Sequence, residues 1–259
     1  MKYNYHTHTD RCHHAVGRER EYIEVAIERG LSGIGISDHC PMPFPRDYPS
    51  HRMTVAEYPE YIESLLALRE EYRGRIEVYI GLEVEYYPLL FPELMRIISP
   101  YPLDYLILGQ HFLSNEFDGG MAAVVPTYDE NDLATYVTQT LEGLEKGVFS
   151  YLAHPDIFNY KGDDASYRRH MLPLIRYAKE QGIPLEYNLL GQRDRRNYPT
   201  DRFFRLVAEE NAPVILGSDA HEPWNVATPE DLREATRRLS ALGITPIEKL
   251  TFRPIPKTN

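Results

Sequence analysis

Histidine is the residue type through which this sequence could do the most chemistry, because ten His occur among its 259 residues. Seven of them follow short apolar runs, and the carboxylates of Asp38, Glu83, Glu85 and Asp219 follow similar runs. Imidazole and carboxylate groups are ligands for Zn, Fe and Mn, and a catalytic site leaves coordination positions for water or substrate. We therefore predict a centre of up to three metals, held by two of these carboxylates and by the seven His, which are His6, His8, His14, His39, His111, His154 and His221.

The individual motifs differ in how specific they are. In His6-Thr7-His8, strand alternation points both imidazoles to the same side of an extended segment, but this spacing also occurs by chance. Ser37-Asp38-His39 is more specific, since it directly follows an apolar run that contains glycine. The same holds for the segment that carries Asp219 and His221. We expect His13, His51 and His170, which fall outside this order, to be ordinary polar residues.

The elements that must position these residues are repeated strand and helix units. Short β-branched runs alternate with segments of helical period, which is typical of a parallel sheet in an α/β fold. The predicted strands are 2–5, 33–37, 76–81, 105–109, 149–153, 184–188 and 213–217. The predicted helices are 18–29, 55–72, 92–98, 129–146, 167–181, 200–211 and 229–242, the last with Thr228 as its N-cap.

On this frame the predicted ligands collect at the carboxyl ends of the strands. That end is where parallel barrels assemble their active sites. Two connections, 40–54 and 114–128, are longer than usual for a strand-to-helix loop. Loops of that length inside a compact domain are usually functional or mobile.

Composition limits the classes of function. The 28 Lys and Arg against 39 Asp and Glu leave a formal charge of −11, which argues against broad binding to nucleic acid or anionic membranes. Because the chain has neither an apolar run of about 18 residues nor an apolar signal segment, we expect a cytoplasmic protein with one domain over 1–259. Two Cys cannot build a disulfide framework or a thiolate cluster.

The ordered motifs resemble the polymerase and histidinol phosphatase superfamily, called the PHP family. The matching segments are His6-Thr7-His8, Cys12-His13-His14-Ala15, Ser37-Asp38-His39, Gly81-Leu82-Glu83, Gly109-Gln110-His111, Ala153-His154-Pro155-Asp156 and Gly217-Ser218-Asp219-Ala220-His221. The resemblance implies a single-domain distorted (β/α)7 TIM-like barrel with a trinuclear metal centre. It also implies that His6, His8, Glu83 and Asp219 surround one metal, that Glu83 bridges to a second held by His111 and His154, and that His14, His39 and His221 hold the third.

Within the family, the sequence is most similar to the monofunctional histidinol-phosphate phosphatase branch. This implies hydrolysis of a small phosphate monoester, L-histidinol phosphate, by a metal-bound hydroxide held by His6, His8, Glu83 and Asp219. Another phosphomonoester, a nucleotide or a phosphodiester remains an alternative substrate, and a non-catalytic metal-binding or sensor domain is an alternative of another class. Zn, Fe and Mn all suit such ligands, so the sequence does not choose between these three divalent ions. It does not indicate the oligomeric state either.

A phosphate ester also needs a cation that binds its free oxygens. Arg193, just past strand 184–188, matches a position that carries Arg in similar phosphatases, and Arg suits bidentate phosphate contact. Arg52 and Lys161 are further candidates, while Arg195 and Arg196 are expected to be a solvated charge run.

Four other residues have open roles. Asp38 and Asp156 could protonate the leaving group, although we expect them to orient neighbouring His or cap loops. Cys12 and Cys40 either lie together beside the third metal or are separate, inert packing residues. Glu85 could face a substrate amine or brace the metal ligands.

Overall fold

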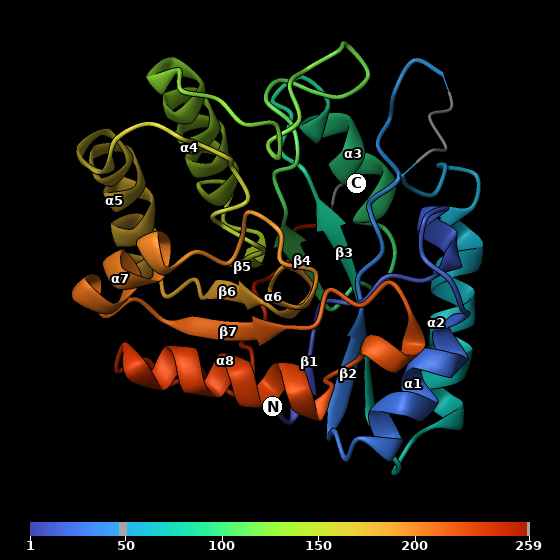
Figure 1. Cartoon of the computed structure of the whole chain (residues 1–259). Helices are drawn as coiled ribbons and strands as arrows, with labels where there is room; N and C mark the ends of the chain where they lie inside the picture. Colours follow the sequence, from blue (N-terminus) through green and yellow to red (C-terminus); the bar gives the residue numbers. More distant parts are fainter. Residues whose placement is uncertain (47–50, 258–259) are drawn as a thin grey trace.

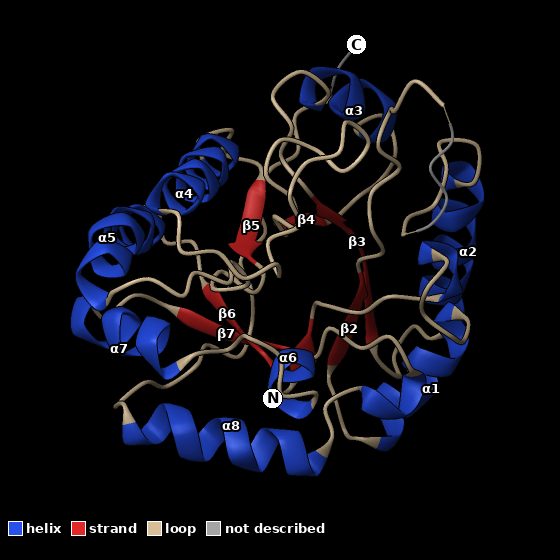
Figure 2. Cartoon of the chain, turned by 45° about the horizontal axis from the view of Figure 1, so that its top comes forward, coloured by secondary structure: helices blue, strands red, loops and turns tan. Residues whose placement is uncertain are grey.

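The structure, a computed structural model that describes residues 1–46 and 51–257, is built on seven parallel strands. The strands are β1 (Tyr3–Asn4), β2 (Gly33–Ile36), β3 (Glu77–Val84), β4 (Tyr105–Leu108), β5 (Phe149–Leu152), β6 (Leu185–Asn188) and β7 (Val214–Gly217). Each strand pairs with the next one along the chain. Figure 2 looks into the ring that they form, with helices around the outside.

The helices follow the strands along the chain and cover the outside of the sheet (Figure 1). They are α1 (Glu19–Glu28), α2 (Tyr58–Glu71), α3 (Phe91–Ile98), α4 (Glu130–Leu144), α5 (Asp164–Glu180), α6 (Leu189–Arg193), α7 (Asp201–Glu210) and α8 (Pro229–Ala241). Two short 3-10 turns, η1 (Asp10–Cys12) and η2 (Pro223–Asn225), lie between a strand and the following helix. No helix among the described residues combines the length and apolar character needed to cross a bilayer.

The barrel is nearly closed and distorted. β5 and β6 share a single residue pair, Leu152 with Leu185, whereas β2 and β3 share four. Between the first and last strands, Thr7 forms a parallel bridge with Ala220, and His8 N–H donates to the Ala220 carbonyl at 2.9 Å. The predicted (β/α)7 TIM-like barrel is therefore confirmed.

Side-chain caps set several helix boundaries. Thr228 accepts a hydrogen bond from Asp231 N–H at the start of α8, as predicted. The prediction placed the start of α5 at residue 167, but the helix begins at Asp164 because Asp163 accepts from Ser166 N–H. α6 was missed altogether, since five residues carry too little periodicity, although Asn188 caps it by accepting from Gly191 N–H.

The end of β3 also differs from the prediction, which stopped this strand at residue 81. The strand continues to Val84 because its residues from Gly81 onward pair with β4. Glu83 therefore lies inside a strand and pairs with Ile107. Its backbone is fixed on both sides, since it also forms a parallel bridge with His39.

The amino ends of the strands close over an aromatic cluster. This cluster consists of the buried residues Tyr5, Tyr105, Ile107, Tyr151, Ala153, Ile215 and Leu250, with Tyr3, Tyr79 and Phe252 packed against them. A Cβ at Gly35 would lie 2.1 Å from the Tyr105 hydroxyl oxygen, so β2 needs glycine here to let the ring approach. The carboxyl ends are left to polar side chains.

Candidate metal centre

The nine predicted ligands gather at the carboxyl ends of the strands. His6 and His8 follow β1, and His39 follows β2. Glu83 is the second-last residue of β3. His154 and Asp219, just after β5 and β7, have positive φ angles of 28° and 46°. Such conformations cost energy in non-glycine residues and concentrate at functional sites.

Glu83 lies at the centre of the group and is 1% exposed. Its Oε1 is 2.8 Å from His154 Nε2, 3.5 Å from His6 Nε2 and 3.6 Å from His111 Nε2. Its Oε2 is 3.1 Å from His39 Nδ1 and 3.4 Å from His8 Nε2. The two carboxylate oxygens therefore face two different sets of imidazoles, as a bridging ligand would.

A second carboxylate, Asp219, faces the first two His. Its Oδ1 lies 3.5 Å from His6 Nε2 and 3.3 Å from His8 Nε2. The two imidazole Nε2 atoms are themselves only 3.1 Å apart. His6, His8 and Asp219 thus offer three ligand atoms close enough to hold one ion.

His14 and His221 form the most telling contact, with their Nε2 atoms 3.0 Å apart. Each Nδ1 lies against a backbone carbonyl, that of Cys12 at 2.8 Å and that of Asp219 at 3.1 Å. A carbonyl only accepts, so each Nδ1 carries a proton and each Nε2 is the nitrogen that would bind a metal. His39 completes this group of three candidate ligands.

The charge states of four groups suit metal binding, whereas at His6 and His111 the neighbouring carboxylates outweigh burial and raise the pKa, that of His111 to about 9, so a metal there would displace a proton. The imidazoles beside Glu83 and Asp219 outweigh burial and hold the pKa of both carboxylates well below the usual range. Burial lowers the pKa of His8 to about 3 and that of His14 to about 4. Neutral imidazole and ionised carboxylate are the forms that bind metals. Glu83 Oε2 and His39 Nδ1 lie 3.1 Å apart, yet within the described residues neither atom makes a hydrogen bond.

The sequence prediction missed one further carboxylate, which contacts a candidate ligand of the centre. Glu186, on β6, is fully buried, and its Oε1 lies 2.7 Å from His6 Nδ1. An acidic residue in a strand buried at every position was the available signal. Glu85 does the same for His111, since its Oε1 lies 2.9 Å from His111 Nδ1. Of its two predicted roles, the structure therefore favours bracing a ligand.

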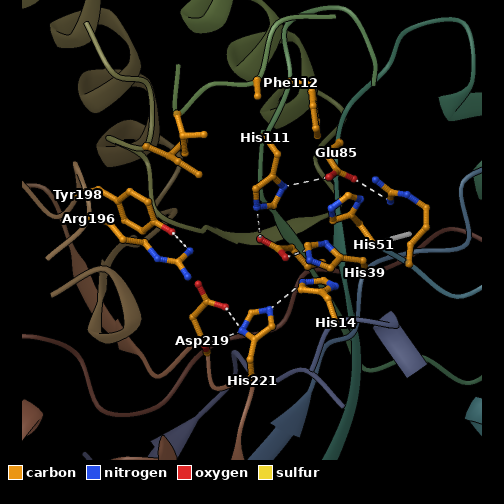
Figure 3. A pocket seen from close by; sticks show the side chains of 15 residues that line it. His14, His39, His51, Glu85, His111, Phe112, Arg196, Tyr198, Asp219 and His221 are labelled. Atoms are coloured by element: carbon orange, nitrogen blue, oxygen red, sulfur yellow. Dashed lines mark hydrogen bonds and ion pairs between the residues drawn. The ribbon is translucent and has the colours of Figure 1, made fainter. Parts of the chain in front are cut away.

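A cavity of about 340 Å³ opens above this centre. Figure 3 shows Arg196 and Tyr198 on the side opposite His14, His39 and His51. The described lining also contains the charged side chains of Arg52 and Glu85, and an apolar part that consists of Phe112, Ala122, Val124 and Ile157. The two long predicted loops contribute to this wall, although residues 47–50 of the first lie outside the described residues.

Comparison with known proteins agrees with this geometry, because residues 4–189 match the PHP domain. The chain belongs to the PHP family. A probable histidinol-phosphatase of Deinococcus radiodurans is 34% identical, over 85% of this chain and 86% of the relative. The histidinol-phosphatase of Bacillus subtilis is 26% identical, over 85% and 94%.

A solved structure shares the whole fold of this PHP protein. The histidinol phosphate phosphatase of Lactococcus lactis, complexed with Zn, L-histidinol and phosphate, superposes with a TM-score of 0.75. It is 20% identical and covers 100% of this chain and 99% of that one. The family match ends at residue 189, so it does not include Asp219 and His221. These two residues lie in the site because they follow β7 at the carboxyl end of the barrel.

The three side chains predicted to bind the phosphate of the substrate, those of Arg193, Lys161 and Arg52, lie in different places in this PHP protein. Arg193 is absent from the described cavity lining, because its guanidinium turns to Asp231 at 3.3 Å and Asp194 at 3.4 Å. Lys161 lies in a separate surface hollow beside Arg202. Arg196 is exposed and pairs with Asp194 at 3.4 Å, as expected of a solvated charge run, and it also lines the cavity and donates to the Tyr198 hydroxyl at 3.1 Å.

Arg52 lines the cavity, but its guanidinium already pairs with two carboxylates. The side chain is buried, with Nη1 3.0 Å from Glu85 Oε2 and Nη2 bonded to Glu116. Its guanidinium also lies over the Phe44 ring at 5.7 Å. Arg52 therefore ties the two long loops to the brace of His111.

The remaining candidates serve the scaffold. Asp38 accepts from Thr9 N–H and Oγ1–H, and Asp156 accepts the same two bonds from Thr200, so each caps a loop as expected. Both Cys are buried thiols. Cys12 donates to the Thr9 carbonyl and lies near His8 and His221, whereas Cys40 packs in the main core.

Proposed function

We propose that this PHP protein is a metal-dependent phosphomonoesterase that hydrolyses L-histidinol phosphate to L-histidinol and phosphate. The observation that carries the proposal is the centre itself, where seven imidazoles and two carboxylates converge on the floor of one cavity. The family and the 34% identical probable histidinol-phosphatase support this substrate. The apolar wall suits the carbon frame of a small leaving group.

The donor set suits three divalent ions. His6, His8, Glu83 and Asp219 would hold the first, Glu83 with His111 and His154 the second, and His14, His39 and His221 the third. Zn is the metal in the Lactococcus lactis structure, and Fe or Mn suits the same ligands. When bound, such ions polarise phosphoryl oxygens and lower the pKa of water enough to form a nucleophile near neutral pH.

Arg196 and Tyr198 are the residues of this chain best placed to act on the ester. The Arg196 guanidinium projects toward Asp219 across the cavity (Figure 3) and can donate to phosphate oxygens in a bidentate manner. Burial raises the pKa of Tyr198, so its phenol keeps its proton. While accepting from Arg196, Tyr198 Oη–H can donate to an ester oxygen. We assign phosphate binding to this pair in place of Arg193 and Lys161.

A panel of phosphate esters tests this function. Protein of measured metal content is assayed for phosphate release from histidinol phosphate, nucleotides and an aryl phosphate. We expect kcat/KM for histidinol phosphate to exceed the others at least about tenfold, which corresponds to about 1.4 kcal/mol of discrimination. Equal rates on all esters would contradict the substrate. No phosphate release from any ester at full metal occupancy would contradict the enzyme.

A further inference from the structure

We propose that Glu186 is a positioning residue, which fixes the metal-binding tautomer of His6 and couples it to two other ligands of the centre. This inference deepens the proposed metal centre and rests on it. Glu186 is absent from the described lining of the cavity, and its side chain is fully buried in β6. Any effect that it has on the reaction must therefore pass through the residues that it holds.

The first contact sets the proton of His6. Glu186 Oε1 lies 2.7 Å from His6 Nδ1, and a carboxylate oxygen accepts a hydrogen bond. The contact therefore places a proton on His6 Nδ1 and makes Nε2, which is 3.5 Å from both Glu83 and Asp219, the nitrogen that would bind a metal. A carboxylate behind a metal-binding His also makes the imidazole a stronger ligand.

The second oxygen holds two other parts of the centre. Glu186 Oε2 accepts from the backbone N–H of His154 at 2.9 Å, at the residue whose φ angle is positive. It also accepts from Asn188 Nδ2 at 2.9 Å, and the same amide nitrogen donates to Asp219 Oδ2 at 3.1 Å. One carboxylate thus links ligands that follow β1, β5 and β7.

The chain makes room for this carboxylate with a glycine. A Cβ at Gly217, the last residue of β7, would lie 1.7 Å from Glu186 Oε1. Alanine at this position must push the carboxylate away from His6 without changing its chemistry. Gly217→Ala therefore offers a second way to break the same contact.

Metal affinity tests the proposal without substrate. Zn²⁺ dissociation constants are measured by chelator competition for the wild type, Glu186→Gln, Glu186→Asp and Gly217→Ala, and the Co²⁺-substituted proteins are compared by absorption spectrum. Glu186→Gln keeps the shape of the side chain but sets an amide N–H against existing donors. We expect at least tenfold weaker binding of the weakest-bound ion, within the roughly 10–100-fold typical of such partners, and an altered Co²⁺ spectrum. Glu186→Asp should recover part of the affinity.

A matched control separates positioning from folding. Glu19, which is 3% exposed and pairs with Arg11, is a buried carboxylate outside the centre. Glu19→Gln should lower the unfolding temperature while leaving Zn²⁺ affinity unchanged. Less than a tenfold loss of affinity in Glu186→Gln overturns the proposal; if that variant does not fold, the same threshold applied to Gly217→Ala decides. Because these readouts need no ester, a failed phosphatase assay would leave this inference standing.

Discussion

The two ends of this barrel are built from the same strands but are stabilised in opposite ways. At the amino end, the Tyr5 and Tyr105 ring centroids lie 5.8 Å apart, and Phe252 stacks on Tyr105 at 5.2 Å. These are favourable aromatic distances that need nothing added. At the carboxyl end, the His14 and His221 Nε2 atoms face each other at 3.0 Å. The amino end is packed by its own side chains, whereas the carboxyl end gathers groups that could hold a metal ion.

The contrast extends along single strands. β3 begins at Glu77, half-exposed and bonded to Lys249 at 3.0 Å, and contains Glu83, buried among five His near its other end. The same residue type therefore forms a surface ion pair at one end and belongs to the candidate metal centre at the other. We expect substitutions at the amino end to affect stability, and substitutions at the carboxyl end to affect metal binding and activity.

The largest effect should come from Glu83→Gln. Removing the bridging charge weakens two sites at once, so we expect loss of bound metal and a fall in phosphate release of more than about a thousandfold, since such ions contribute several kcal/mol. Metal analysis and a phosphate assay measure both. Glu77→Gln, on the same strand, is the control and should keep metal and activity. Equal behaviour of the two variants would remove the distinction between the ends.

Phe252→Ala tests the amino end. This ring packs on Tyr5, Tyr79 and Tyr105, so its removal leaves a cavity and should lower the free energy of unfolding by up to about 3 kcal/mol. Denaturant unfolding measures the loss. Metal content and kcat per folded molecule should not change, and a fall in either would mean that the two ends are coupled.

Arg196→Ala should have a smaller effect, confined to substrate. Removing the cavity guanidinium should lower kcat/KM about 10–100-fold, or about 1.4–2.7 kcal/mol, while metal content stays unchanged. Arg193→Ala is the matched variant, because this Arg pairs with Asp231 outside the described cavity lining. If Arg193→Ala caused the larger loss, the phosphate contact would belong to Arg193, as the sequence prediction had it.

Arg52→Lys should have the smallest effect. It tests the comparison because Arg52 lies at the carboxyl end of the barrel, yet we assign it a structural role. Lys keeps the charge but cannot contact Glu85 and Glu116 with a planar fork. We expect a loss of about 1–2 kcal/mol in unfolding free energy, as for a charged hydrogen bond. KM should change by less than about threefold, and a larger rise would instead make Arg52 a phosphate ligand.

The sequence predicted the barrel and the end of it at which the candidate ligands gather, because both depend on local pattern. Short apolar runs identify buried parallel strands, and a polar residue just after such a run must reach the rim. Local pattern could not separate Arg193 from Arg196, because a five-residue helix, α6, decides which of them faces the cavity. Glu186 was missed because its partner His6 is 180 residues away in the sequence.

Metal-dependent hydrolysis of histidinol phosphate is the central claim, and reconstitution of the metal-free protein tests it most directly. The chelated protein is titrated with Zn²⁺ while bound metal and phosphate release from histidinol phosphate are measured on the same samples. We predict no release without metal and a rise in activity that saturates as the sites fill. Phosphate release that survives chelation, or full occupancy without release, would contradict this account.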